Sequence, residues 1–145
     1  MSEAQNFRPV TSYIPHRAPM LLVDRIIEIT REKITSELTI KEDNIFFDSG
    51  LLIEPGLIEH MAQTSALHAG YWYKDEDKDA PVGFIGLIRD LKIYALPAAG
   101  SVIFTRSELT QRVLNANLSC GKVFCKDRLL AQCEMRIFEI WERKT

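Results

Sequence analysis

The sequence lacks an excess of positive charge. Its 145 residues include 18 lysines and arginines against 20 aspartates and glutamates, which gives a formal net charge of −2. A protein that binds nucleic acid needs a basic surface to hold the phosphate groups. We therefore expect no nucleic acid among the partners of this chain.

Long apolar runs are missing as well. No stretch reaches the roughly 18 apolar residues that a membrane-spanning helix requires. The first ten residues, MSEAQNFRPV, contain no apolar run of the signal-peptide type. From these two absences we expect no membrane association and a place in the cytoplasm.

Cysteine is scarce. The three residues Cys120, Cys125 and Cys133 are an odd number and show no CxxC spacing. Disulfide frameworks use even numbers of cysteines, and zinc sites use closely spaced cysteines and histidines. The sequence thus predicts neither disulfides nor a metal site, and we expect reduced cysteines that fill space in the core.

The patterns that are present describe one α+β domain. The length fits a single compact domain over residues 1–145, of which 1–11 are expected to be loosely ordered. Residues 33–41 alternate strictly between apolar and polar faces, which predicts a half-buried strand. The prolines at 15 and 19 delay the preceding strand to Met20. Further extended segments are predicted at 82–96, 101–113, 116–126 and 128–141.

A buried helix is predicted between the second and third strands. Residues 42–56 are expected to form a loop that Pro55 and Gly56 close, and the helix to run from Leu57 to Tyr73. Glu59 is its only formally charged residue, so the helix is apolar on nearly every side and must be covered by its surroundings. The fold expected from this order is an antiparallel six-stranded sheet wrapped around one long central helix.

Several segments, in this order, carry a family resemblance. They are PHRAPMLLVDR at 15–25, the phenylalanine pair at 46–47, EHMAQ at 59–63, GFI at 83–85 and LPAAG at 96–100. Together they resemble the 3-hydroxyacyl-acyl-carrier-protein dehydratases of the FabZ type, which have the hotdog fold. The resemblance covers residues 12 to about 140.

The resemblance implies an activity and an assembly. It implies dehydration of a 3-hydroxyacyl thioester on the phosphopantetheine arm of an acyl carrier protein, without a further cofactor. It also implies a dimer whose two sheets join into one. In this family a histidine removes the α-proton and a helix carboxylate from the opposite protomer helps the hydroxyl depart. Glu59 matches the carboxylate, and the expected substrate-binding residues are Gly56, Gln63, Ala66, Gly83 and Phe84.

The family's histidine has no counterpart at its usual place. It stands in a G-H-F-P segment soon after the paired phenylalanines, whereas this chain reads FFDSGLLIEPG at 46–56. The loop is also shorter than the family pattern. The family's use of a glycine N–H at the start of the helix to hold the thioester carbonyl is therefore in question for Gly56.

Three other histidines are possible replacements. At 100° per residue, His60 lies about 100° and His68 about 180° from Glu59 around the helix, so neither shares its groove within one protomer. We expect both to be packing or interface residues. His16 belongs to the PHR segment, where a structural role is the simpler interpretation, but it remains a candidate for the missing base.

One helix stripe is expected to face the acyl chain. Glu59, Gln63, Ala66 and Gly70 share it, and their side chains are small or polar. Glu59 either favours the helix dipole from the first turn or, if buried among apolar neighbours, acts as a proton donor. Gln63 either orients Glu59 or forms hydrogen bonds across the groove.

Three functions are compatible with these residues. In the first, the chain is the glutamate-bearing half of a heterodimeric dehydratase, similar to the histidine-lacking subunit of aryl polyene pigment clusters. In the second, it is a hotdog thioesterase that needs no histidine. In the third, it is a catalytically silent acyl-binding subunit. Partners are expected to be an acyl carrier protein and a second hotdog subunit, identical or related. The basic cluster Lys122, Lys126 and Arg128 is a candidate for steering the carrier.

Overall fold

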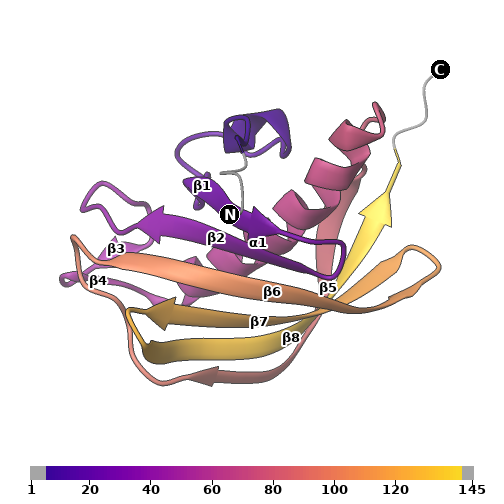
Figure 1. Ribbon diagram of the computed structural model, residues 1–145. Helices are drawn as coiled ribbons and strands as arrows, with labels where there is room; N and C mark the ends of the chain where they lie inside the picture. Colours follow the sequence, from indigo (N-terminus) through magenta and orange to yellow (C-terminus); the bar gives the residue numbers. More distant parts are fainter. Residues whose placement is uncertain (1–5, 142–145) are drawn as a thin grey trace.

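One long helix lies against a six-stranded antiparallel sheet in the computed structural model, which describes residues 6–141 (Figure 1). The helix is α1 (Glu54–Asp75), and the strand order is β1-β2-β6-β7-β8-β5. The strands are β1 (Arg25–Ile29), β2 (Lys33–Thr39), β5 (Val82–Ile93), β6 (Val102–Val113), β7 (Ala116–Cys125) and β8 (Arg128–Ile140). The predicted α+β class, a sheet curved around one helix, is confirmed.

Three shorter elements complete the described chain. A 3-10 helix, η1 (Val10–Ser12), precedes the sheet, and β3 (Phe47–Asp48) and β4 (Leu51–Leu52) form a small hairpin before α1. Five of the six predicted strands agree with the observed bounds to within about three residues. Among residues 6–141, no helix is long and apolar enough to cross a membrane.

Alternation along the strands builds the core. Ile34, Ser36 and Leu38 on β2 are buried, while the residues between them are partly exposed. The sheet packs its buried face on α1, whose Leu57 and Met61 are almost fully buried. The period of two predicted for 33–41 is therefore confirmed, and it aims one face of the sheet at the helix.

The first strand begins at Arg25, not at Met20 as predicted. The backbone before it is paired with helix side chains: the Leu22 N–H donates to Gln63 Oε1 at 2.7 Å, and Gln63 Nε2 donates to the Met20 carbonyl at 2.7 Å. His60 Nδ1 lies 2.6 Å from the Leu22 carbonyl. These side chains take the place of a neighbouring strand. The backbone of Met20 and Leu22 is therefore anchored without belonging to the sheet, with Leu22 buried and the Met20 side chain exposed.

The helix begins three residues before the predicted Leu57 and ends two residues after Tyr73. Pro55 lies in its first turn and does not close the preceding loop. The first N–H groups of a helix have no partner within the helix, so proline loses nothing there, and its fixed φ suits the turn. The proline that was interpreted as a loop end therefore opens the helix.

The N-terminal segment packs on the helix. Val10 is buried, and the Phe7 ring meets the Tyr71 ring edge-on with centroids 5.9 Å apart. At Gly70, a Cβ would collide with the Tyr13 carbonyl oxygen, so only glycine allows this approach. Phe7 and Val10 thus pack against the rest of the chain, the loose ordering expected for residues 1–11 stays a prediction, and residues 1–5 lie outside the described residues.

The cysteines are free, and their burial follows the strand period. Cys133 is buried beside Met61, with the two sulfur atoms 3.8 Å apart, and burial raises the pKa of its thiol to about 11. Cys125 is half-buried. Cys120 is exposed, which corrects the expectation of a packing role, because β7 turns its neighbours Ser119 and Gly121 inward instead.

Candidate active site

Glu59 is held by the residue one helical turn further on. Gln63 Nε2 donates a hydrogen bond to Glu59 Oε1 at 2.9 Å. The Glu59 side chain is half-buried, with 24% of its surface exposed. Because α1 starts at Glu54, Glu59 lies in the second turn, beyond the turn where a carboxylate gains most from the helix dipole. The position favours a role in the site over one in capping.

Gln63 orients Glu59 and also forms hydrogen bonds to the segment before β1, so it performs both of the roles that the sequence left open. Its side chain is 1% exposed, and its amide is fixed by the backbone of the segment before β1. The Leu22 N–H identifies the amide oxygen, so the amide nitrogen faces Met20 and Glu59. All its polar atoms are engaged inside the chain, so the structure shows Gln63 positioning Glu59, and its expected contact with substrate stays a prediction.

His60 and His68 are packing residues within the protomer, as expected. His60 is fully buried, and this burial lowers its pKa to about 4, so the ring is neutral and donates through Nδ1 to the Leu22 carbonyl. His68 Nε2 lies 2.8 Å from the Thr30 carbonyl, and burial lowers its pKa too. Neither imidazole is directed at Glu59.

His16 is the histidine that the fold brings to the carboxylate. Its Nε2 lies 4.0 Å from Glu59 Oε1, and 30% of its side chain is exposed. Arg17 fixes this stretch by donating to the carbonyls of Ile14 and His16 at 2.9 and 2.8 Å. The separation exceeds a direct hydrogen bond, but the two groups interact electrostatically when the imidazole is protonated.

The segment where the family resemblance implies a histidine base contains a tight hairpin here. Ser49 and Gly50 have positive φ angles of 51° and 86°, which turn β3 back into β4. The hairpin is tied to the 95–101 segment through the Leu52 N–H, which donates to the Pro97 carbonyl at 2.9 Å. No histidine occurs between residues 46 and 56, so this chain supplies no base from that place.

Gly56 has a packing role. A Cβ there would lie 2.7 Å from Leu52 Cδ1 and 2.8 Å from Phe46 Cβ. Its N–H donates to the Ile53 carbonyl at 2.9 Å and is therefore engaged within the first helical turn. This bond agrees with the doubt raised from the sequence about a thioester contact at this N–H, and the substrate-binding role expected for Gly56 stays a prediction.

The remaining candidates are spread along the helix and one sheet edge. Gly83 and Phe84 lie on β5, where Phe84 is 52% exposed at the edge of the sheet, so within one chain they do not extend the wall beside Glu59. Ala66 is half-buried on α1 and lines a cavity. Gly70 lines the same cavity and lies against the Tyr13 backbone.

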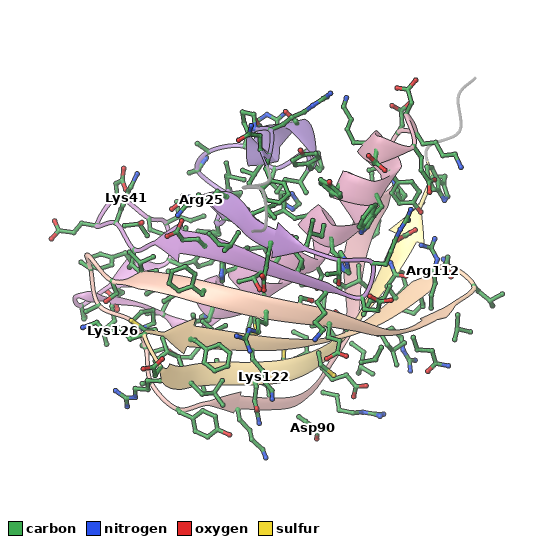
Figure 2. The ribbon with its side chains drawn as sticks, viewed as in Figure 1. Arg25, Lys41, Asp90, Arg112, Lys122 and Lys126 are labelled. Carbon is green, nitrogen blue, oxygen red and sulfur yellow. The ribbon has the colours of Figure 1, made fainter. Side chains whose placement is uncertain are left out.

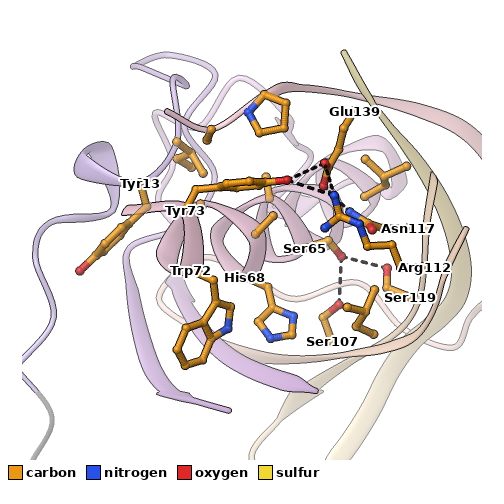
Figure 3. A pocket seen from close by; sticks show the side chains of 18 of the residues that line it. Tyr13, Ser65, His68, Trp72, Tyr73, Ser107, Arg112, Asn117, Ser119 and Glu139 are labelled. Carbon is orange, nitrogen blue, oxygen red and sulfur yellow. Dashed lines mark hydrogen bonds and ion pairs between the residues drawn. The ribbon is translucent and has the colours of Figure 1, made fainter. Parts of the chain in front are cut away.

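That cavity, of about 450 Å³, lies between the C-terminal half of α1 and strands β6 to β8 (Figure 3). Ser65 Oγ lies 2.9 Å from Ser107 Oγ and 3.1 Å from Ser119 Oγ. Glu139, 5% exposed, accepts hydrogen bonds from Tyr73 and Arg112, both at 3.0 Å. No local sequence pattern pointed to these residues, although Ser107, Ser119 and Glu139 occupy inward positions of their strands.

The three residues of the predicted basic cluster are exposed, but they are spread over β7, the turn after it and the start of β8. Figure 2 shows Lys126 at the β7–β8 turn and Lys122 part-way along β7. Lys122, Lys126 and Arg128 are all exposed. Among residues 6–141, no group of three histidine, cysteine, aspartate or glutamate side chains lies together as a metal site would require.

The family model and the curated relatives that resemble this chain are dehydratases. A family model described as ApeP-like, ApeP dehydratase, matches residues 8–143. The 3-hydroxyacyl-[acyl-carrier-protein] dehydratase FabZ of Syntrophobacter fumaroxidans is 29% identical over 132 residues, covering 87% of this chain and 88% of the relative. The protein of the same name from Dinoroseobacter shibae is 32% identical over 133 residues, covering 83% and 78%.

A solved structure shares the fold. The dehydratase heterocomplex ApeI:P from Xenorhabdus doucetiae contains a chain that superposes with a TM-score of 0.88 at 23% identity. The match covers 93% of both chains. The helix, the sheet order and the short hairpin described above therefore form the predicted hotdog fold.

Proposed function

The chain belongs to the ApeP-like dehydratases, a family related to FabZ, and we propose that it is the glutamate-bearing subunit of a heterodimeric 3-hydroxyacyl-[acyl-carrier-protein] dehydratase. The observation that carries this proposal is a carboxylate that Gln63 holds in place, in a chain with no histidine in the 46–56 hairpin. In this proposal Glu59 supplies the acid of the reaction, and a second subunit supplies the base.

The proposed reaction divides between two groups. A histidine of the second subunit removes the proton from the α-carbon, and the electron pair of that C–H bond forms the new double bond beside the thioester carbonyl. The C–O bond at the β-carbon breaks as Glu59 gives its proton to the hydroxyl, which leaves as water. Because Gln63 and His16 both approach Oε1, Oε2 is the oxygen that meets the hydroxyl.

The edge strand β5 is the proposed contact between the subunits. It pairs with β8 on one side only, so its other edge offers unpaired N–H and C=O groups. Phe84, Ile85 and Leu87 on it are 40–52% exposed. The similar chain solved as part of a dehydratase heterocomplex supports assembly with a second kind of subunit.

The substrate is proposed to arrive in the cytoplasm on the phosphopantetheine arm of an acyl carrier protein, the carrier named in the FabZ relatives. No further cofactor enters this chemistry. The exposed Lys122, Lys126 and Arg128 offer positive charge to an acidic carrier.

A homodimer that uses His16 is the second candidate, because His16 lies 4.0 Å from Glu59 in the same chain. In that case the base comes from the PHR segment. The geometry favours this homodimer less than the heterodimer. The base and the acid of a dehydratase must act on two adjacent carbons of a substrate that lies between them. Here the imidazole and the carboxylate face each other instead.

One experiment separates the two candidates. The chain is assayed alone and with a hotdog subunit that carries the G-H-F-P histidine, on a 3-hydroxyacyl carrier-protein thioester, and the new conjugated double bond is followed by absorbance. We expect turnover only in the mixture, abolished by Glu59→Gln and retained by His16→Gln. Comparable turnover by the chain alone, abolished by His16→Gln, would establish the homodimer instead.

A further inference from the structure

Among residues 6–141, His16 is the only ion-pair partner of Glu59, with its Nε2 4.0 Å from Glu59 Oε1. A lysine or an arginine at this distance would hold the carboxylate in its charged form. Histidine instead takes up and releases a proton near neutral pH. The partner that the fold gives to the acid is therefore one that can supply a proton.

The two ring nitrogens of His16 differ in their surroundings. Nδ1 is buried and has no hydrogen-bond partner among the described residues, whereas Nε2 is not buried. The side chain as a whole is 30% exposed. A proton therefore enters and leaves this ring through Nε2, which is also the nitrogen that faces Glu59.

The backbone around His16 is fixed, while its ring keeps some freedom. Arg17 donates to the carbonyls of Thr11, Ile14 and His16 at 3.2, 2.9 and 2.8 Å. The 4.0 Å between Nε2 and Oε1 exceeds a hydrogen bond by about 1 Å, so the ring is not locked onto the carboxylate. A small rotation of the side chain lets Nε2 bind water in one position and Glu59 in the other.

The proposed dehydration leaves Glu59 without its proton after every turnover. The base of the second subunit gains the α-proton, while Glu59 gives its own proton to the departing hydroxyl. Before the next substrate reacts, the base must release a proton and Glu59 must regain one. Because Oε2 meets the substrate in this reaction, Oε1 is the side of the half-buried carboxylate that remains for a donor.

We propose that His16 returns the proton to Glu59 after each turnover. The inference rests on the proposed function, in which Glu59 is the acid. The N–H bond at Nε2 of the imidazolium breaks as the proton forms an O–H bond at Oε1. The neutral ring then takes a proton from solvent through the same nitrogen. His16 acts through Glu59 and does not touch the substrate.

Gln63 directs the restored proton toward the substrate. Its Nε2 donates to Oε1 at 2.9 Å, and an unprotonated carboxyl oxygen is the better acceptor for this hydrogen bond. The terminal torsion of a glutamate is broad and roughly two-fold. A half-turn of the carboxyl group therefore places its unprotonated oxygen against Gln63 and its new O–H bond on the side of the reacting hydroxyl.

The first turnover and the later ones separate this role from others. In the mixed dimer the first turnover uses a proton already on Glu59, so His16→Gln should leave the single-turnover rate unchanged. In steady state at pH 7.5 in weak buffer, kcat of this variant should fall roughly tenfold, because water alone returns the proton slowly. The ratio kcat/KM should stay unchanged, since it covers only the steps up to the chemistry. Both rates are followed by the absorbance of the new double bond.

Rescue by a small molecule identifies the proton as the missing component. His16→Ala should show the same loss and leaves space for added imidazole, which should restore kcat. Pyrazole has the same size and shape but carries no proton to donate near neutral pH, so it should not restore kcat. His60→Asn is the control, because the His60 ring bonds to the Leu22 carbonyl and not to Glu59; its kcat should not respond to imidazole.

Three results would overturn the relay. An unchanged kcat in both His16 variants would mean that the proton returns by another route. Equal falls in the single-turnover and steady-state rates would make His16 a base or a structural residue, and equal rescue by pyrazole would mean that the ring only fills space. A mixed dimer that forms no double bond at all would overturn the proposed function itself, so the two failures are distinguishable.

Discussion

Gln63 donates a hydrogen bond to Glu59 at 2.9 Å while its own side chain is almost fully buried. The same amide bonds to the backbone of Met20 and Leu22. The orientation of the carboxylate is therefore fixed by a segment some forty residues earlier in the chain, and the site and the fold are coupled through a single side chain.

Gln63→Met tests this coupling. The substitution keeps the volume but leaves the Leu22 N–H and the Met20 carbonyl without partners, each at a cost of about 1–3 kcal/mol in unfolding free energy. We expect a loss of about 2–4 kcal/mol in urea unfolding, and a fall in turnover of the mixed dimer at temperatures where the variant is still folded. Gln111→Met, at an exposed position, is the control; a variant as stable and as active as the parent would contradict the coupling.

Gly56→Ala separates packing from carbonyl binding. The new Cβ would press on Leu52 and Phe46, which predicts a loss of about 1–3 kcal/mol in unfolding free energy. The rate per folded molecule should change little, because the Gly56 N–H is bonded to the Ile53 carbonyl. Gly121→Ala, where the nearest atom is the Met61 sulfur at 3.4 Å, is the matched control. A large fall in kcat with unchanged stability would restore the carbonyl-binding role.

The sequence predicted the features that depend on local patterns. The alternation at 33–41 placed Ile34 and Ser36 on the buried face, and the EHMAQ segment located Glu59. The extended segment at Met20 failed because its hydrogen-bond partners are the side chains of His60 and Gln63, which no local pattern reveals.

The cavity was missed for a related reason. Its polar wall is assembled from three elements. From the sequence alone, a serine that lines a cavity cannot be told apart from a serine that is packed in a core. A signal did exist at Glu139, which continues the inward series of Cys133, Met135 and Ile137 on β8. A charged residue in the buried phase of a strand needs a partner, and Arg112 is that partner.

Phe84→Lys should weaken the assembly without unfolding the chain. Phe84 is 52% exposed on the edge strand β5, so a lysine there is tolerated by the protomer but places charge in a sheet-to-sheet contact. We expect a smaller species by size-exclusion chromatography with a similar urea midpoint for the protomer. Val113→Lys, at a position that is 45% exposed at the end of β6, should leave the assembly intact. An unchanged assembly would place the subunit contact elsewhere.

His60 predicts how stability depends on pH. Burial lowers its pKa from 6.5 to about 4, so the folded chain holds it neutral. The unfolded chain binds the proton first as the pH falls, and the stability present above pH 6.5 is lost as the pH falls toward 4. At pH 4.5 this group alone removes on the order of 2–3 kcal/mol.

The matched variant for this prediction is His60→Asn, whose amide donates to the Leu22 carbonyl in place of Nδ1 but does not titrate. Urea unfolding at pH 7.5 and at pH 4.5 gives the loss of free energy for each protein. The loss should be smaller in the variant by the amount that His60 contributes, since His68 and the carboxylates titrate equally in both. Equal losses would mean that the imidazole takes up its proton inside the fold, which is incompatible with a neutral ring buried against the Leu22 carbonyl.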